Sequence, residues 1–172
     1  MKNLWEIPLT VKIVYSTSNW SQSGWPLVRV LFNDKIVANF EANGNQVEFT
    51  VQQDPNLQGN STLVIEHYGK NYHNDNSFFQ VEKVYINNID FEKILWEGVQ
   101  HQVLPPWDWE KDVDKCDVGN MYLGHNGQIV WNFKNPILFD IRDRLDKQVK
   151  PISGQDSTRE VLNQVKKFFF DL

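Results

Sequence analysis

The first clear structural signal in the chain lies in residues 9–16, which read Leu9-Thr10-Val11-Lys12-Ile13-Val14-Tyr15-Ser16. Large apolar side chains recur at every second position, which is the period of a β-strand with one buried face. The same alternation returns in residues 27–32, where Val28, Val30 and Phe32 share one face. We therefore predict that these segments are strands that turn one face to a core and the other to solvent.

Short turns separate further segments of this kind in the first half of the chain. The pairs Asn33-Asp34 and Asn87-Asn88 fit two-residue β-turns, and Asn43-Gly44-Asn45 predicts the close of another hairpin. Strand patterns lie in residues 35–42, 46–51, 62–68, 79–86 and 89–91. Because no helical period lies among them, the pattern predicts a mainly β fold, a jelly-roll-like antiparallel β-sandwich.

The sequence changes character after Glu92, where tryptophans and prolines become frequent. We predict a sandwich domain over residues 1–92 and an extension over residues 93–172 that packs on it. The extension begins with a tryptophan-rich segment and a β-hairpin, in which Asn126-Gly127 forms a type I′ turn between residues 121–123 and 129–133.

Two helices are predicted to end the extension. Asn135 caps the first helix and Pro136 takes its first position, and Asp140 and Arg144 stand one turn apart as an ion pair. Its buried stripe is Ile137, Leu138, Ile141, Leu145 and Val149. Ser157 and Glu160 form a capping box that begins the second helix.

Composition limits the classes of function. The 172 residues are 41% hydrophobic and 23% charged, which excludes a disordered chain. The net charge of −5 argues against nucleic acid and anionic membranes as partners. The N-terminus lacks an apolar signal-like stretch, and no apolar run approaches the ~18 residues of a membrane span. We therefore expect cytoplasmic synthesis without a signal peptide, and no membrane partner.

No sequence motif indicates catalysis, so we assign no catalytic residue and expect that the protein is not an enzyme. A serine-nucleophile elbow, a phosphate-binding glycine loop and a zinc-protease motif are all missing from the sequence. The acidic segment 108–117 leaves two chemical readings open, glycoside hydrolysis and calcium binding. Its candidate carboxylates are Asp108, Glu110, Asp112 and Asp114. We favour a solvated acidic loop, because Asp117 stands where an EF-hand needs glycine.

A group of aromatic and amide residues lies in the loops of the predicted sandwich. The chain holds seven tryptophans and is rich in asparagine and glutamine, and such side chains are typical of sugar-binding surfaces. Loops at one end of a sandwich come together, so we predict a glycan site there. Its residues are Asn19, Trp20, Trp25, Tyr72 and Asn74. The alternative is that Trp20 and Trp25 only close the end of the sandwich.

Residues 23–34 resemble the second-strand segment of calcium-dependent, xylan-binding-type carbohydrate-binding modules, in which glycine, tryptophan and proline precede an alternating strand. Residues 76–88 are similar to the last strand pair of that family. The resemblance implies a β-sandwich that binds glycans with calcium. It places Asn76 where the family has a calcium-ligating aspartate, with Asp75 one residue away, whereas Asn88 replaces the family's turn glycine. The expected cofactor is therefore none or Ca²⁺, with Asp75 and Asn76 as its ligands.

A sandwich followed by such an extension also resembles small structural proteins of tailed-phage virions. That resemblance implies a non-catalytic virion component, used for capsid decoration or as a tail accessory, which would place the protein in the virion. Its partner would be another virion protein or a second copy of this chain, contacted through Phe168, Phe169 and Phe170. The alternative function is a glycan-binding module for polysaccharide recognition, and a virion protein could also contact surface glycans.

Overall fold

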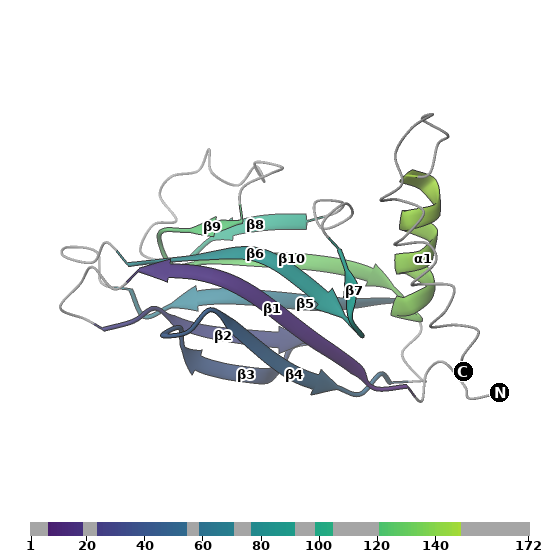
Figure 1. Cartoon of the computed structure of the whole chain (residues 1–172), viewed down its shortest axis with the longest axis horizontal. Coiled ribbons are helices and arrows are strands. Elements are labelled where there is room, and N and C mark those ends of the chain that lie inside the picture. Colours follow the sequence, from purple (N-terminus) through teal and green to yellow (C-terminus); the bar gives the residue numbers. More distant parts are fainter. Residues whose placement is uncertain are drawn as a thin grey trace.

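The protein is described by a computed structural model over residues 7–18, 24–54, 59–70, 77–91, 99–104 and 121–148. These residues form ten strands and one helix (Figure 1). The elements in chain order are β1 (Leu9–Ser18), β2 (Leu27–Phe32), β3 (Lys35–Glu41), β4 (Gln46–Val51), β5 (Asn60–Tyr68), β6 (Phe78–Ile86), β7 (Ile89–Asp90), β8 (Val99–Val103), β9 (Tyr122–Leu123), β10 (Gly127–Lys134) and α1 (Ile137–Gln148).

The strands form two antiparallel sheets, so the predicted mainly β sandwich is confirmed. Sheet A has the order β4-β1-β6-β7, with β9 also paired to β6, and sheet B has the order β3-β2-β5-β10-β8. In Figure 1 the strands of sheet A lie in front of those of sheet B, and α1 stands at one end of the sheets. The layered arrangement gives each sheet one inner face and one outer face.

The core between the sheets is built by the alternation that the sequence shows. In β1, the residues Leu9, Val11, Ile13 and Tyr15 are buried and their neighbours are less so. Burial also raises the pKa of the Tyr15 phenol. In β5, Leu63, Ile65 and His67 face inward, and His67 Nδ1 lies 3.0 Å from the carbonyl oxygen of Leu123. His67 is therefore a hydrogen-bonded residue of the core.

Two of the predicted turns are confirmed by their backbone angles. Asn33, Asp34, Asn87 and Asn88 all have positive φ, as both central residues of a type I′ turn require. Asn33 also accepts a hydrogen bond from the backbone N–H of Thr62, which ties its turn to β5. In contrast, residues 43–45 connect β3 of sheet B to β4 of sheet A, so they cross between the sheets instead of closing a hairpin.

The strands β9 and β10 correct the predicted hairpin of residues 121–133. β9 pairs with β6 in sheet A, whereas β10 pairs with β5 and β8 in sheet B. Asn126 and Gly127 lack the positive φ of a type I′ turn. The Asn126 side chain instead accepts a hydrogen bond from the backbone N–H of Lys70, 2.8 Å away. Residues of the predicted extension therefore supply a strand to each sheet.

Helix α1 packs its predicted stripe against the sandwich, with Ile137, Leu138, Ile141 and Leu145 buried. The predicted ion pair is confirmed, because Arg144 Nη2 lies 2.7 Å from Asp140 Oδ2. Asp140 also accepts a hydrogen bond from the backbone N–H of Lys134, at the end of β10. Pro136 follows a cis peptide bond and precedes the helix, so it does not take the predicted first helical position. Val149, Ser157 and Glu160 lie outside the described residues.

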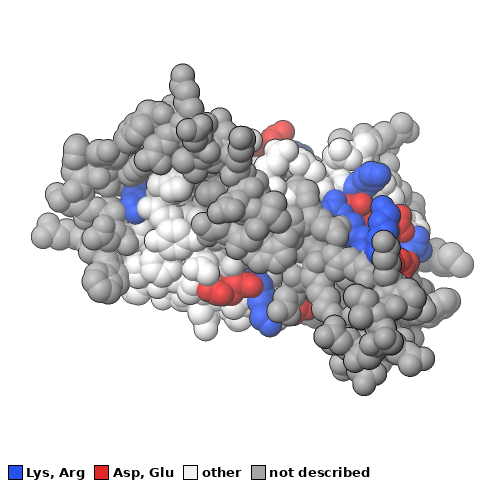
Figure 2. Space-filling model, turned by 90° about the horizontal axis from the view of Figure 1, so that it is seen from above, with Lys and Arg blue, Asp and Glu red and all other residues white. Residues whose placement is uncertain are grey.

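Charged side chains of both signs gather at the end of the molecule that carries α1 (Figure 2). On α1 itself, Arg142 forms an exposed ion pair with Asp143, and Arg144 pairs with the buried Asp140. Within the described residues, no helix has the length and apolar character needed to cross a membrane.

The packing of β10 gives a first prediction. Ile129 is 0% exposed and pairs with Ile65 across β5, whereas its neighbour Val130 is half-buried on the outer face. We expect Ile129→Ala to lower the free energy of unfolding by about 2–5 kcal/mol, because it leaves a cavity in the core. Val130→Ala serves as the matched control and should cost clearly less in the same urea titration. Equal losses from the two variants would contradict the assignment of inner and outer faces.

Candidate functional site

Polar side chains form a continuous row across the outer face of sheet B. Arg29 on β2 is the register partner of Asn39 on β3 and of Glu66 on β5. Glu66 is opposite Gln128 on β10, and Gln128 is opposite Gln102 on β8. The register therefore places one polar residue of every strand of the sheet side by side. We call this set the polar row: Asn39, Arg29, Glu66, Gln128 and Gln102.

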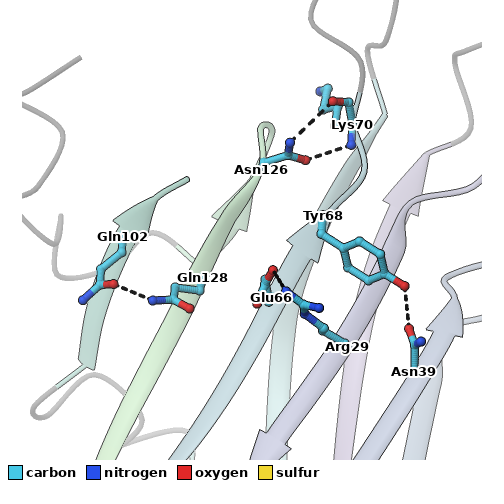
Figure 3. Close-up of polar contacts among 8 residues, drawn as sticks. All are labelled: Arg29, Asn39, Glu66, Tyr68, Lys70, Gln102, Asn126 and Gln128. Carbon is cyan, nitrogen blue, oxygen red and sulfur yellow. Dashed lines mark hydrogen bonds and ion pairs between the residues drawn. The ribbon is translucent and has the colours of Figure 1, made fainter. Parts of the chain in front are cut away.

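Hydrogen bonds within the row hold its side chains in place (Figure 3). Arg29 Nη2 donates to Glu66 Oε1 over 2.6 Å, and Gln128 Nε2 donates to Gln102 Oε1. Tyr68, two residues after Glu66, donates its hydroxyl to Asn39 Oδ1 over 2.7 Å. These contacts leave further donors and acceptors on the same groups, because each amide and the guanidinium carry more of them than the contacts use.

Arg29 occupies the most constrained position in the row. Its side chain is 38% exposed, whereas that of Glu66 is only 9% exposed. The hydrogen bond to Glu66 raises the pKa of the Arg29 guanidinium. The guanidinium also lies over the Tyr68 ring, with 5.0 Å between Arg29 Cζ and the ring centroid. The Arg29 Nε atom is buried and finds no hydrogen-bond partner among the described residues.

Apolar residues border the polar row on the same face of the sheet. On four of the five strands, β3, β2, β5 and β10, the neighbouring outward position carries a hydrophobic side chain, and these positions are register partners. We call this set the apolar row: Ile36, Leu31, Val64 and Val130. Ile36 on the edge strand β3 is 57% exposed, and the other three are half-buried. On β8 the corresponding position is Gln100.

On the opposite side of the polar row, β2 begins at Leu27 at the end of the sheet, and Trp25 lies two residues before it. Leu27 is 38% exposed and is the register partner of Tyr68. Pro26 and Val28 are buried while Trp25, Leu27 and Arg29 are less so, which places Trp25 on the outer side by alternation. Trp25 is half-buried, and it is the one predicted glycan-site residue that lies within the described residues.

The remaining predicted site residues lie outside the described residues. These are the glycan candidates Asn19, Trp20, Tyr72 and Asn74, the calcium candidates Asp75 and Asn76, and the interface candidates Phe168, Phe169 and Phe170. Their roles stay predictions, as do those of the acidic segment 108–117. Among the residues that the structure describes, no cluster of three or more His, Cys, Asp or Glu side chains could hold a metal ion.

Two of the predicted loops carry glycan candidates, one with Asn19 and Trp20 and the other with Tyr72 and Asn74. The strand ends that flank these loops lie at one end of the sandwich. Ser18 at the end of β1 is the register partner of Phe78 at the start of β6, and Leu27 is the partner of Tyr68. Lys70 connects several segments at this end of the sandwich. Its Nζ atom donates to the carbonyl oxygens of Ser77, over 2.7 Å, and of Gly124. One ammonium group thus joins the end of β5 to the start of β6 and to the turn before β10.

The outer face of sheet A differs in kind from that of sheet B. Its charged residues include Lys12 and Glu48, which are register partners across β1 and β4, and Lys83, whose Nζ lies 3.8 Å from Asp90 Oδ2. It also has a cation over a ring, because Lys12 Nζ lies 4.7 Å from the centroid of Tyr85. Charged side chains that face solvent are ordinary in a sandwich, whereas sheet B adds a row that combines three amides with a hydrogen-bonded Arg–Glu pair.

Sequence reasoning missed the polar row, although the signal for part of it was present. Period two already placed Arg29, Glu66 and Tyr68 on outward faces. What the sequence did not reveal is that β5 lies between β2 and β10, so that residues distant in the chain become neighbours. The strand β8, which supplies Gln102, was not predicted at all.

Comparisons with known proteins add the following. No protein-family model matches the chain, and no curated protein matches its sequence. Among solved structures, the chain is similar to the selenomethionine form of vCBM60, from work on a circular permutation linking two families of calcium-dependent carbohydrate-binding modules. The TM-score is 0.47 at 12% identity, covering 71% of this chain and 88% of that chain.

A second similar structure is vCBM60 in complex with galactobiose. Here the TM-score is 0.45 at 13% identity, and the match covers 72% of this chain and 98% of that chain. At these scores and identities, the similarity assigns no ligand, metal or residue role to this protein.

Lys70 gives the second prediction. Lys70→Met keeps the length of the side chain but leaves the carbonyl groups of Ser77 and Gly124 without this donor. We expect a loss of about 1–3 kcal/mol in the free energy of unfolding, as for buried polar groups left without a partner. The control Lys83→Met removes only an exposed ion pair and should change stability by less than about 1 kcal/mol. Thermal and urea unfolding measure both variants, and equal effects would contradict a connecting role for Lys70.

Proposed function

We propose that the protein is a non-catalytic carbohydrate-binding protein and that the outer face of sheet B is its binding surface. The observation that carries this proposal is the polar row, in which three amides, a guanidinium and a carboxylate lie side by side. Arg29 is hydrogen-bonded to Glu66, and Gln128 to Gln102. The aromatic ring of Tyr68 contacts the row through Arg29 and Asn39, and half-buried Trp25 precedes β2 on the same side of the row as Tyr68.

The chemistry of this surface suits a ligand that carries many hydroxyl groups. Each hydroxyl can donate one hydrogen bond and accept others, and amides offer both functions on a single side chain. Aromatic rings supply flat apolar faces on which the C–H side of a sugar ring can pack. The hydrogen bonds between Tyr68 and Asn39 and between Gln128 and Gln102 hold these groups before a ligand arrives, which reduces the entropy lost on binding.

Binding without bond cleavage follows from the position of the row's carboxylate. Glycoside hydrolysis uses two carboxylic groups with separate roles, one as the acid and one as the base or nucleophile. The polar row contains one carboxylate, Glu66, which is almost buried and paired with Arg29 at 2.6 Å. We assign Glu66 the role of fixing the guanidinium, whose remaining N–H groups can donate to the ligand.

The third prediction tests the face directly. Electrophoresis through gels that contain xylan, galactan, mixed-linkage glucan or polygalacturonate should retard the wild-type protein on at least one of the polysaccharides. We expect Arg29→Ala to weaken this binding about 10-fold to 100-fold, the range for losing hydrogen bonds to a charged group. Gln128→Ala should weaken it less, because it removes a neutral group.

The matched control is Lys12→Ala, which removes the corresponding cation over a tyrosine on sheet A. It should leave retardation unchanged, and circular dichroism should show the same fold for all three variants. Retardation by no polysaccharide, or an equal loss in Lys12→Ala and Arg29→Ala, would contradict the proposal.

Metal dependence provides the fourth prediction. The donors and acceptors of the polar row are side-chain groups that need no cation to act, so we expect EDTA to leave glycan affinity unchanged in calorimetric titration. Loss of binding in EDTA with recovery on adding Ca²⁺ would contradict sheet B as the binding surface. It would support the predicted site at Asp75 and Asn76 instead.

The virion role predicted from the sequence stays a prediction. Its contact residues Phe168, Phe169 and Phe170 lie outside the described residues. The same holds for the predicted protein partner and for the localisation.

A further inference from the structure

We infer that the ligand is a linear, uncharged oligosaccharide that lies along the polar row, with its long axis across the strands of sheet B. This inference rests on the proposed function and adds the direction and the charge of the ligand. Two features of the outer face carry it: the order of polar and apolar positions, and the pairing of the charges.

The order of residues along each strand argues against a ligand that runs parallel to the strands. On β2, Arg29 is followed outward by Leu31, on β5 Val64 precedes Glu66, and on β10 Gln128 is followed by Val130. A chain of sugars that runs along any of these strands toward the apolar row would place its hydroxyls on an apolar side chain at the next position. Burying a hydroxyl without a partner is costly.

A ligand that runs across the strands keeps polar partners for its whole length. From Asn39 on β3 to Gln102 on β8, every strand contributes one member of the polar row. Strands in a sheet lie about 4.8 Å apart, so the row extends roughly 19 Å, which exceeds the size of a single sugar. The apolar row runs parallel to it and can contact the C–H groups along one side of the chain.

Exposure along the row also fits an elongated ligand. The members at the two edges of the sheet, Asn39 and Gln102, are exposed, whereas Glu66 in the middle is nearly buried. The amide groups at both ends are therefore accessible to the ends of a ligand whose centre contacts Arg29. Figure 3 shows the two edge residues on opposite sides of the Arg29–Glu66 pair.

The charges of the row favour an uncharged ligand. The one cation, Arg29, is paired with the one carboxylate, Glu66, at 2.6 Å, and the other three members are neutral amides. An anionic chain would have to compete with Glu66 for the guanidinium at one point, and would find no second cation within the row. Repulsion from the nearby Glu66 and from Glu41, exposed at the end of β3, would add to this cost.

The test uses oligosaccharides of increasing length, prepared from the neutral polysaccharide that retards the protein most strongly. Calorimetric titration compares the wild type with Asn39→Ala and Gln102→Ala, which truncate the two ends of the row. We expect affinity to rise with length, and each edge variant to weaken binding of the longest oligomer about threefold to tenfold while leaving the disaccharide unchanged. Oligogalacturonides, which carry a carboxylate on every sugar, should bind more weakly than neutral oligomers of equal length.

The matched control is Gln46→Ala, which removes an exposed amide from β4, an edge strand of sheet A, and should have no effect at any length. If Arg29→Ala abolishes binding but the two edge variants bind every oligomer like the wild type, the direction is wrong and the proposed function stands. Tighter binding of the oligogalacturonides would overturn the assignment of an uncharged ligand. If no glycan binds at all, both the proposed function and this inference fail.

Discussion

Sheet B depends on the pairing of β10 with β5, which joins two segments far apart in the sequence. Ile129 and Ile65 meet on the inner face and are both fully buried, and this pairing fixes the register of the whole strand. Because side chains alternate with period two, the same register places Gln128 beside Glu66 on the outer face. The core contact and the polar row are therefore two consequences of one pairing, and a shift by one residue would destroy both.

That pairing also explains which parts of the structure could be predicted from sequence. Period-two burial identified the strands of residues 9–16 and 27–32 and their inner faces, because it is a local property. The type I′ turns at Asn33-Asp34 and Asn87-Asn88 were equally local. The order of strands in a sheet is not local, and so the assignment of β9 and β10 to different sheets was missed. The Asn126-Gly127 pair misled the prediction because the Asn126 side chain bonds to Lys70 instead.

The candidate site was predicted only in part, for the same reason. Sequence reasoning looked for aromatic and amide residues close together in the chain, which selected loops. Trp25 belongs to the predicted loop group and also to the outer side of sheet B, because it follows one of those loops and continues the outer alternation of β2. The amides of the polar row come from β3, β8 and β10, and nothing in their separate segments indicates that they share a surface. A property of the sheet as a whole cannot be found by reading one strand at a time.

The ion pair of Arg29 and Glu66 at the centre of the row stabilises the sheet and also belongs to the proposed binding surface. A nearly buried carboxylate such as Glu66 needs a cation, and Arg29 meets that need through one side of its guanidinium. The planar guanidinium carries five N–H donors in fixed directions. Pairing with one carboxylate oxygen therefore leaves further N–H donors oriented but unused. The guanidinium of Arg29 also lies over the Tyr68 ring, which further limits its motion. The Tyr68 hydroxyl in turn donates a hydrogen bond to Asn39 and so holds the Asn39 side chain in place. The contacts that stabilise the outer face therefore also fix the groups that the proposed binding would use.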